Sequence, residues 1–293
     1  MTYREALTAG TEVLQLAGIE EAALDGWYLL EYVCHITRSE FYLKENETLS
    51  EEDQLHYENA VKKRASRVPL QYILGTQEFM GLTFAVNSNV LIPRQDTETL
   101  VELALTEIPR EVGEDNQAEF SVLDLCTGSG CIAVSIKKNR PEVRMTASDA
   151  SKQALLVAKE NAKANETEMV FVRSDLFDNL NEAFDMIISN PPYIRTAEIP
   201  TLQAEVAEFE PVTALDGHED GLYFYRRIAS EAPSYLKEGG RLLMEIGNDQ
   251  GESVKGLLEK EGFTDIRIKQ DLAGLDRVVI ACAPKKEGEA WNV

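Results

Sequence analysis

The sequence predicts an α/β fold: a mostly parallel seven-stranded sheet with an antiparallel last strand, plus a small all-helical N-terminal domain. From Phe120 onward, short apolar runs alternate with helical patterns, which is typical of a parallel sheet with right-handed crossover helices. Residues 1–70 show only the helical spacing of apolar side chains. The 293 residues, 44% of them hydrophobic, are enough for one large domain or two modest ones with cores of their own.

The N-terminal part is expected to contain three helices. Leu7 and Leu14 fall on one face of the first helix, and a second apolar stripe covers residues 27–34. Ser50 is expected to cap a third helix that ends near Arg67, because a serine oxygen accepts hydrogen bonds from the free N–H groups of a first turn.

The amino-acid composition changes after the helical part. Residues 69–93 are rich in aromatic and β-branched side chains, and Gly81 and Asn87 are suited to turns, so this part predicts a β-hairpin linker. Asp96 is expected to cap a helix that runs to about Ile108, and a polar loop at 109–119 comes next. These patterns divide the chain into a helical domain (1–70), a hairpin linker (71–93), a sheet domain (94–283) and a polar tail (284–293).

The sheet domain is expected to alternate strands and helices. Strands are predicted at 121–125, 143–148, 169–173, 184–189, 241–246, 265–269 and 277–282. Helices are predicted near 131–139, 152–165, 222–236 and 250–261. The last two strands have no helix between them, so we expect them to pair antiparallel.

Charge and composition exclude several classes. Lys and Arg total 29 against 51 Asp and Glu, a net charge of −22, which repels phosphate backbones. The one basic cluster, at the end of the third predicted helix, is best interpreted as a solvated face that compensates the helix C-terminus, and the alternative is a docking patch for an RNA-associated partner. Its residues are Lys62, Lys63, Arg64 and Arg67. The four cysteines form no C-x-x-C pair and the three histidines are scattered, so no metal is predicted.

Targeting signals are also missing from the sequence pattern. No apolar run approaches the length of a membrane span, and charged residues interrupt the first 16 positions where a signal peptide would be apolar. We therefore expect a cytoplasmic protein without a membrane partner.

A glycine-containing loop follows the first predicted strand of the sheet. It consists of Cys126, Thr127, Gly128, Ser129 and Gly130. Glycines allow a sharp turn and a close ligand, and ligands of open parallel sheets bind where such strands end. Asp149 ends the next strand, where a carboxylate can accept hydrogen bonds from ribose hydroxyls. A nucleoside-bearing ligand is predicted, but the loop also fits the dinucleotide pattern G-x-G-x-x-A, so its identity stays open.

A second motif ends the strand at 184–189. It is Asn190, Pro191, Pro192 and Tyr193. The two prolines make this turn rigid, so the Asn190 side-chain oxygen and the Pro191 carbonyl are expected to be two fixed acceptors with the Tyr193 ring beside them. This arrangement suits a planar –NH2 group, either an amide or the exocyclic amine of a base.

Together these motifs resemble the Rossmann-like class I methyltransferases that modify amino groups with S-adenosylmethionine. The resemblance narrows to the protein-(glutamine-N5) methyltransferases that act on peptide chain release factors, and it covers nearly the whole chain. Further segments match this family in order, at 67–75, 90–98, 174–177, 210–211, 220–222, 245–247 and 276–278. The resemblance implies methyl transfer to the side-chain amide nitrogen of a glutamine in the Gly-Gly-Gln motif of release factors, a modification that belongs to translation termination.

The resemblance also implies roles for single residues. The loop 126–130 would hold the methionine end of the cofactor, Asp149 its ribose, and Asp175 and Phe177 its adenine. Asn190 would contact both the cofactor and the substrate.

The implied substrate site is the second motif. The catalytic and substrate-binding residues would be Asn190, Pro191, Pro192 and Tyr193. Arg94 would bind substrate and Glu98 would line the same cleft.

Two departures from the family pattern stand out. Cys126 occupies a position that is usually glycine, so a positive φ there would be strained. Gln95 replaces a common proline, which loosens that turn without removing a chemical group.

Other functions stay open at this point. An adenine-N6 nucleic-acid methyltransferase could use the same Asn-Pro-Pro-Tyr motif, but it would have to flip a base and grip phosphates, against which the charge of −22 argues. A dehydrogenase would have no use for the motif. A non-catalytic adaptor that binds S-adenosylmethionine is the third possibility. The expected partner is a release factor, which the helical domain would recognise. We expect no direct contact with nucleic acid, and we expect the protein to be a monomer.

Overall fold

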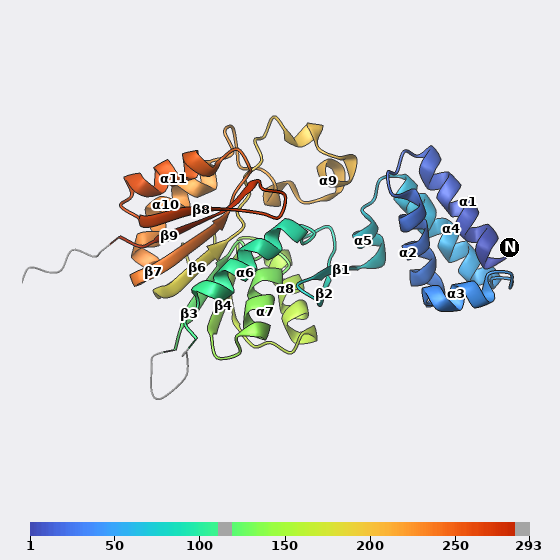
Figure 1. Ribbon diagram of the computed structural model, residues 1–293, viewed down its shortest axis with the longest axis horizontal. Coiled ribbons are helices and arrows are strands. Elements are labelled where there is room, and N and C mark those ends of the chain that lie inside the picture. The colour runs from blue at the N-terminus through green and yellow to red at the C-terminus, as the bar shows by residue number, and fades with distance from the viewer. Residues whose placement is uncertain (111–118, 285–293) are drawn as a thin grey trace, which may run out of the picture. The chain divides into compact units, whose positions relative to one another are not determined.

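The structure is a computed structural model that describes residues 1–110 and 119–284 (Figure 1). Most of the predicted polar loop and nearly all of the predicted tail lie outside these residues. The chain forms two compact units. The first comprises Met1–Thr76 and Gln203–Phe209, and the second comprises Gln77–Leu202 and Glu210–Val293.

The first unit is helical. Its helices are α1 (Tyr3–Leu16), α2 (Ala22–Cys34), α3 (Arg38–Lys44), α4 (Glu51–Ala65), α5 (Leu70–Leu74) and α9 (Ala204–Phe209). Ser50 caps α4 as predicted, because its hydroxyl accepts from the N–H of Asp53. The side chains of Leu14, Trp27 and Tyr57 are almost fully buried in a core shared by α1, α2 and α4.

The basic cluster at the end of α4 is not uniformly solvated, which corrects that expectation. Lys62 and Lys63 are exposed, but Arg64 is buried and donates from Nε to Asp25 Oδ2 at 2.7 Å and from Nη1 to Glu205 Oε1 at 2.8 Å. Arg67 also pairs with Glu205, at 3.1 Å. These ion pairs fix α9, a helix that the sequence analysis did not predict, to the helical unit.

The predicted hairpin is shorter than expected. Residues 70–74 form α5, which ends at Gly75 with φ of +77°, a conformation that favours glycine. The hairpin then consists of β1 (Thr76–Phe79) and β2 (Leu82–Ala85), joined at Met80 and Gly81.

The second unit contains a seven-stranded sheet with the order β5-β4-β3-β6-β7-β9-β8. The strands are β3 (Ser121–Leu125), β4 (Arg144–Asp149), β5 (Val170–Arg173), β6 (Phe184–Ser189), β7 (Leu236–Glu245), β8 (Thr264–Gln270) and β9 (Asp276–Cys282). Neighbouring strands from β5 to β7 are parallel, whereas β9 is antiparallel to both β7 and β8. This confirms the predicted fold. β7 begins five residues earlier than the predicted 241.

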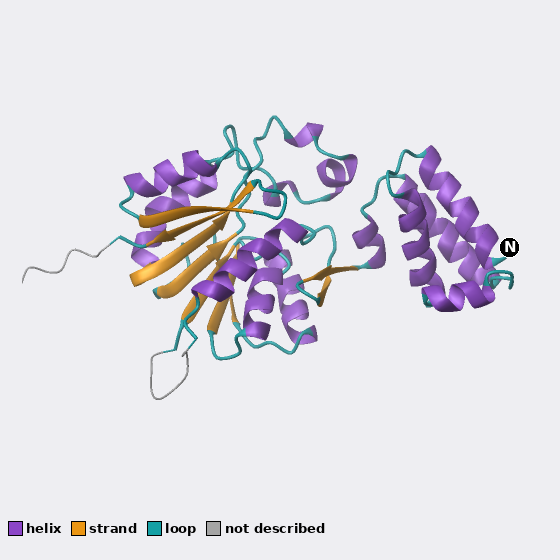
Figure 2. Cartoon of the chain, in the orientation of Figure 1, coloured by secondary structure: helices purple, strands orange, loops and turns teal. Residues whose placement is uncertain are grey.

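Helices cover both faces of this sheet (Figure 2). They are α6 (Glu98–Glu107), α7 (Cys131–Asn139), α8 (Lys152–Ala164), α10 (Tyr223–Tyr235) and α11 (Gly251–Lys260), with short 3-10 turns η1 (Gln95–Thr97), η2 (Ile199–Thr201) and η3 (Val212–Ala214). One core joins the sheet to α6 and α7, and the other joins it to α10 and α11. Asp96 lies within η1, and the helix that we expected it to cap begins at Glu98, two residues after Asp96.

The order of the strands reverses between β3 and β6. These strands are buried on both faces, and their last residues, Leu125 and Ser189, are register partners. The Ser189 hydroxyl also donates to the carbonyl of Leu125 at 2.7 Å. The loop at 126–130 and the turn at 190–193 therefore start side by side, where ligands of such sheets bind.

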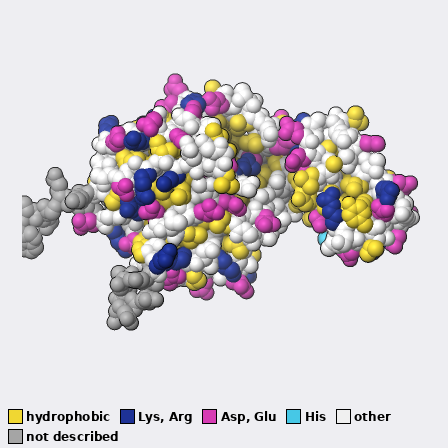
Figure 3. Space-filling model, in the orientation of Figure 1, with side chains coloured by type: hydrophobic (Ala, Val, Ile, Leu, Met, Phe, Trp, Pro, Cys, Tyr) yellow, Lys and Arg dark blue, Asp and Glu magenta, His cyan; other side chains and the backbone are white. Residues whose placement is uncertain are grey.

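Acidic and basic side chains are interspersed on the face of the molecule shown in Figure 3. Among the described residues, no helix is long and apolar enough to cross a bilayer.

Candidate active site

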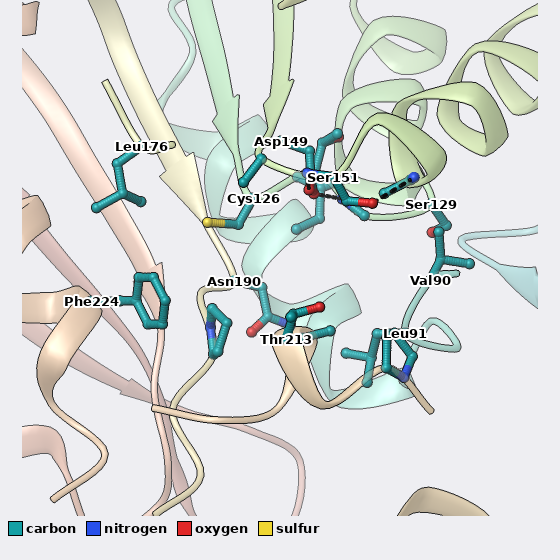
Figure 4. Close-up of a pocket in the computed structure, with 18 of the residues that line it drawn as sticks. Val90, Leu91, Cys126, Ser129, Asp149, Ser151, Leu176, Asn190, Thr213 and Phe224 are labelled. Carbon is teal, nitrogen blue, oxygen red and sulfur yellow. Dashed lines mark hydrogen bonds between the residues drawn. The ribbon is translucent and has the colours of Figure 1, made fainter. Parts of the chain in front are cut away.

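A cavity of about 560 Å³ opens at the carboxyl ends of the central strands (Figure 4). Its walls come from the loops after β3, β4, β5 and β6 and from two segments, 89–97 and 211–227. All of these belong to the sheet unit. In Figure 4, Asn190 lies between Leu176 and Phe224 on one side and Leu91 on the other.

The loop after β3 lines the cavity as the sequence predicts. Cys126, Thr127, Gly128 and Ser129 contribute to the wall. Cys126 has φ of +63°, so the strain expected from a non-glycine residue at this position is present. Gly130 has φ of +82°, and a Cβ there would lie 3.0 Å from the Cβ of Ala158, so this position needs glycine both for its conformation and for its contact with α8.

Asp149 is fixed beneath this loop. Its Oδ2 accepts from the N–H of Gly128 at 2.9 Å and its Oδ1 from the N–H of Ser151 at 2.8 Å. Burial raises the pKa of Asp149, while these two N–H groups act in the opposite direction. Each carboxylate oxygen keeps a second lone pair, so the residue can accept two hydroxyl donors from the cavity that it lines.

A second carboxyl group lies deeper in the same region. Asp124 in β3 is completely buried, and its Oδ2 accepts from the Thr127 hydroxyl and from the N–H of Ala133. Its Oδ1 has no hydrogen-bond partner among the described residues. Burial raises the pKa of Asp124 to about 7.

This pKa makes the stability of the free protein depend on pH. A carboxyl with a raised folded-state pKa disfavours the folded state once it ionises, so stability falls as pH rises from about 4 toward 7. Asp124→Asn removes this term and keeps an acceptor for Thr127. As pH rises across this range, we expect the difference in free energy of unfolding between the variant and the parent to shift by about 4 kcal/mol in favour of the variant. Urea unfolding at several pH values measures this, and a constant difference would contradict the buried ionisation.

The structure separates Asp175 from Phe177. Asp175 lines the cavity and accepts from Arg227 Nη1 at 2.8 Å. Phe177 lies in the core, stacked on Tyr235 with 4.7 Å between ring centroids, and is not among the residues that line the cavity. Leu176 lines the cavity instead.

The turn after β6 contributes unequally to the cavity wall. Asn190 and Pro192 line it, whereas Pro191 and Tyr193 do not. Asn190 donates from Nδ2 to Thr97 Oγ1 at 3.3 Å, and the Tyr193 hydroxyl donates to Glu245 Oε1 at 3.2 Å. The first and last residues of the turn are therefore hydrogen-bonded to Thr97 and Glu245, to which the sequence analysis assigned no role.

Arg94 also lines the cavity, but its guanidinium is engaged. It forms an ion pair with Glu210, whose side chain is 1% exposed and also accepts from the N–H of Ile92. Glu98 accepts from the N–H of Met80 and is not among the lining residues, so it does not occupy the place expected for it.

Sequence analysis missed several side chains of the cavity wall. They are Val90, Leu91, Thr213, His218, Tyr223 and Phe224. The rings of His218 and Tyr223 pack edge-on, with 4.3 Å between centroids. The available signal was their position within or beside the matching segments at 90–98, 210–211 and 220–222. Among the described residues, no group of three or more His, Cys, Asp or Glu could hold a metal ion.

The site combines features that suit a nucleoside bound beside an amide. It has a tight loop with positive φ, a fixed carboxylate at the end of β4, and an asparagine on a rigid turn facing the same cavity. S-adenosylmethionine fits this set, because Asp149 would accept its ribose hydroxyls and the loops on either side of Asp149 would hold its other two ends.

Known proteins resemble the chain over almost all of its length. Residues 5–75 match the family described as the PrmC N-terminal domain, and residues 103–207 match the methyltransferase small domain. The release factor glutamine methyltransferase of Geobacter sulfurreducens is 42% identical over 279 residues, covering 95% of each chain. The protein of the same name from Clostridium acetobutylicum is 41% identical, covering 96% of this chain and 98% of the relative.

Solved structures support the fold. The hMettl16 catalytic domain, solved in complex with an RNA hairpin of the MAT2A 3'UTR, has a TM-score of 0.54 and 15% identity, and the match covers 76% of this chain and 81% of that chain. A methyltransferase from Pyrococcus furiosus has a TM-score of 0.50 at 15% identity, covering 76% of this chain and 99% of that chain. On the strength of the near full-length relatives, the chain belongs to the family of release factor glutamine methyltransferases, which are S-adenosylmethionine-dependent enzymes.

Proposed function

We propose that the protein methylates the side-chain amide nitrogen (N5) of the glutamine in the Gly-Gly-Gln motif of peptide chain release factors. The observation that carries this proposal is the place of Asn190. It lies on a rigid turn, lines the cavity, and uses its Nδ2 for a bond to Thr97, which leaves its Oδ1 to accept a substrate N–H.

Several residues of the cavity would fit parts of the cofactor. S-adenosylmethionine supplies a methyl group already activated by a sulfonium leaving group. The loop at 126–130 would surround its methionine end, and Asp149 would accept its two ribose hydroxyls. Asp175 and Leu176 would border the adenine, with Leu176 replacing Phe177 in the expected set.

Asp149 provides a direct test of this placement. Asp149→Ala should weaken S-adenosylmethionine binding by about 1.5–3 kcal/mol, the range for hydrogen bonds to a charged group. Isothermal titration calorimetry measures the change. Asp178→Ala is a suitable control, because Asp178 is an exposed acid outside this cavity and should leave the affinity unchanged. Equal affinities for the parent and the Asp149 variant would contradict the ribose assignment.

The protein's task at the substrate is orientation. An amide nitrogen is a poor nucleophile because its lone pair is delocalised into the carbonyl. Asn190 Oδ1 would hold one N–H group and favour a pyramidal nitrogen whose lone pair points at the methyl carbon. The Pro191 carbonyl, the second acceptor that the motif predicts, is not among the residues that line the cavity. Positioning of this kind can contribute about 7–11 kcal/mol, which is enough to carry most of the catalysis.

Methylation assays separate this function from the alternatives. A release factor and duplex DNA are incubated in parallel with the protein and labelled S-adenosylmethionine, and the products are located by mass spectrometry. We expect one methyl group on the glutamine of Gly-Gly-Gln and none on adenine. Label on adenine would support a nucleic-acid methyltransferase, and binding of cofactor without transfer would support an adaptor.

We further propose that the helical unit recognises the body of the release factor. It has a core of its own and is stabilised by ion pairs at Arg64 and Arg67. A monomeric enzyme acting in the cytoplasm on free release factors, without direct nucleic-acid contact, is consistent with the charge of −22.

A further inference from the structure

A buried asparagine connects the loop at 126–130 to the hairpin. Asn161 lies in α8 and is 1% exposed. Its Nδ2 donates to the Ser129 carbonyl at 2.9 Å and to the Ala85 carbonyl at 3.0 Å, and its Oδ1 accepts from the N–H of Ala85 at 2.7 Å. Ser129 lines the cavity, whereas Ala85 belongs to β2 and does not. One side chain therefore contacts both the wall of the active site and a strand outside it.

The hairpin fixes the orientation of this amide. Phe84, the neighbour of Ala85, is fully buried in the core of the sheet unit, and its ring packs edge-on against Phe79 of β1 with 6.0 Å between centroids. A reversed Asn161 amide would place its –NH2 against the N–H of Ala85 and its oxygen against two carbonyls, so only one orientation satisfies all three bonds. The second N–H of Nδ2 is therefore directed at Ser129.

The loop that contains Ser129 has an unfavourable backbone conformation. Cys126 and Gly128 have φ of +63° and +55°, and Cys126 is not a glycine. Such conformations persist where surrounding contacts determine them. Asp149 holds the N–H of Gly128, and Asn161 holds the carbonyl of Ser129, a residue that is 3% exposed. Loss of the second bond leaves a buried carbonyl without this donor, which favours movement of the loop.

We infer that Asn161 is a positioning residue that supports the loop at 126–130 from the hairpin and thereby increases the affinity for S-adenosylmethionine. This inference rests on the proposed placement of the methionine end of the cofactor at that loop. Because one amide bonds both segments, the effect is reciprocal: a cofactor that fixes the loop also stabilises the bonds to β2.

Two asparagines of the same helix provide a matched pair of variants. Asn165 Nδ2 donates to the carbonyls of Thr83 in β2 and of Asn161, at 3.1 and 2.9 Å, so it also connects α8 to the hairpin, and its side chain does not bond the loop. Asn161→Ala should raise the Kd for S-adenosylmethionine about tenfold, the effect of one hydrogen bond. Asn165→Ala should leave the Kd unchanged. Isothermal titration calorimetry measures both values.

Steady-state kinetics separate positioning of the cofactor from a general loss of structure. For Asn161→Ala we expect a higher KM for S-adenosylmethionine and a parent-like kcat at saturating cofactor, because the substitution leaves Asn190 and its turn in place. A lower kcat with an unchanged KM would overturn the inference. Equal losses of affinity in the Asn161 and Asn165 variants would also overturn it, since they would show that only attachment of the hairpin matters.

Hydrogen exchange of the parent protein tests the connection without any substitution. When S-adenosylhomocysteine is added, peptides that cover residues 82–85 should exchange more slowly, because a fixed loop holds Asn161 and its bond to the N–H of Ala85. Peptides over β8, at the edge of the sheet, serve as the reference and should not change. Unchanged exchange at 82–85 would contradict the connection, even if Asn161→Ala fails to fold.

The Asp149→Ala variant distinguishes this inference from the proposed placement of the cofactor. If the Asp149 and Asn161 variants both bind S-adenosylmethionine like the parent, the placement itself fails. If Asp149→Ala weakens binding and Asn161→Ala does not, the placement stands and only the support from Asn161 is refuted.

Discussion

Asn190→Ala is expected to lower kcat on a release factor by about 10²–10³-fold, or ~3–4 kcal/mol of transition-state stabilisation. The substitution removes the fixed side-chain acceptor that would align the substrate amide as its nitrogen becomes pyramidal, so the loss should appear in kcat. Pro191 and Pro192 still define the path of the turn. Single-turnover kinetics with labelled S-adenosylmethionine provide the measurement.

The same variant should leave cofactor affinity largely intact, since Asp149 and the loop at 126–130 carry that interaction. Asn139→Ala is a matched control, because Asn139 is exposed at the end of α7 and donates only to the Ser135 carbonyl. Asn190→Asp keeps the shape and an acceptor oxygen but adds a charge beside the sulfonium. If Asn190→Ala turns over at nearly the parent rate, the motif is only a turn.

The sheet could be predicted from sequence because its strands are specified locally. β3 and β6 are short, mostly apolar segments that end at a loop and at a proline turn, and the structure has both at the predicted bounds. In the structure β3 and β6 pair with Leu125 opposite Ser189, at the point where the strand order reverses and where ligands of such sheets bind. That pairing brings the loop and the turn together.

Elements held by distant contacts could not be predicted in this way. α9 spans six residues, and the contacts that fix it come from Arg64 and Arg67, about half the chain away. Residues 70–74 carry apolar and aromatic side chains that suit a strand as well as a helix. In the structure they form a short helix that ends at Gly75.

Sequence motifs could not show which side chains of the predicted site point into the cavity. Phe177 belongs to a matching segment, but its ring is buried against Tyr235, and the neighbouring Leu176, with φ of +45°, reaches the cavity. Thr97 and Glu245 are 148 positions apart, and only the structure shows that both lie behind Asn190 and Tyr193. Motifs located the site, whereas the residues that orient it depend on tertiary packing.

The backbone of the turn is itself held against a second segment. The N–H of Ile194 donates to the Leu215 carbonyl at 2.9 Å, and the N–H of Gly217 donates to the Ile194 carbonyl at 2.8 Å. Gln250 Nε2 donates to the Tyr193 carbonyl at 3.0 Å. Residues 215–217 therefore form a rigid support directly beside Tyr193.

Gly217→Ala is expected to disturb the chemistry without touching a reacting group. A Cβ at this buried glycine would lie 2.7 Å from the Cα of Tyr193 and 2.8 Å from its carbonyl carbon, distances at which the backbone must move. Displacement of a positioning group by about 1 Å can cost on the order of 10²-fold in rate, and we expect a loss of that size in kcat. Gly256→Ala is the matched control, because Gly256 is exposed in α11 with no atom near its added Cβ; it should keep full activity and a slightly higher melting temperature. If the Gly217 variant binds S-adenosylmethionine like the parent yet loses turnover, close packing behind Tyr193 is required for alignment of the turn. Full activity would show that the turn tolerates the shift.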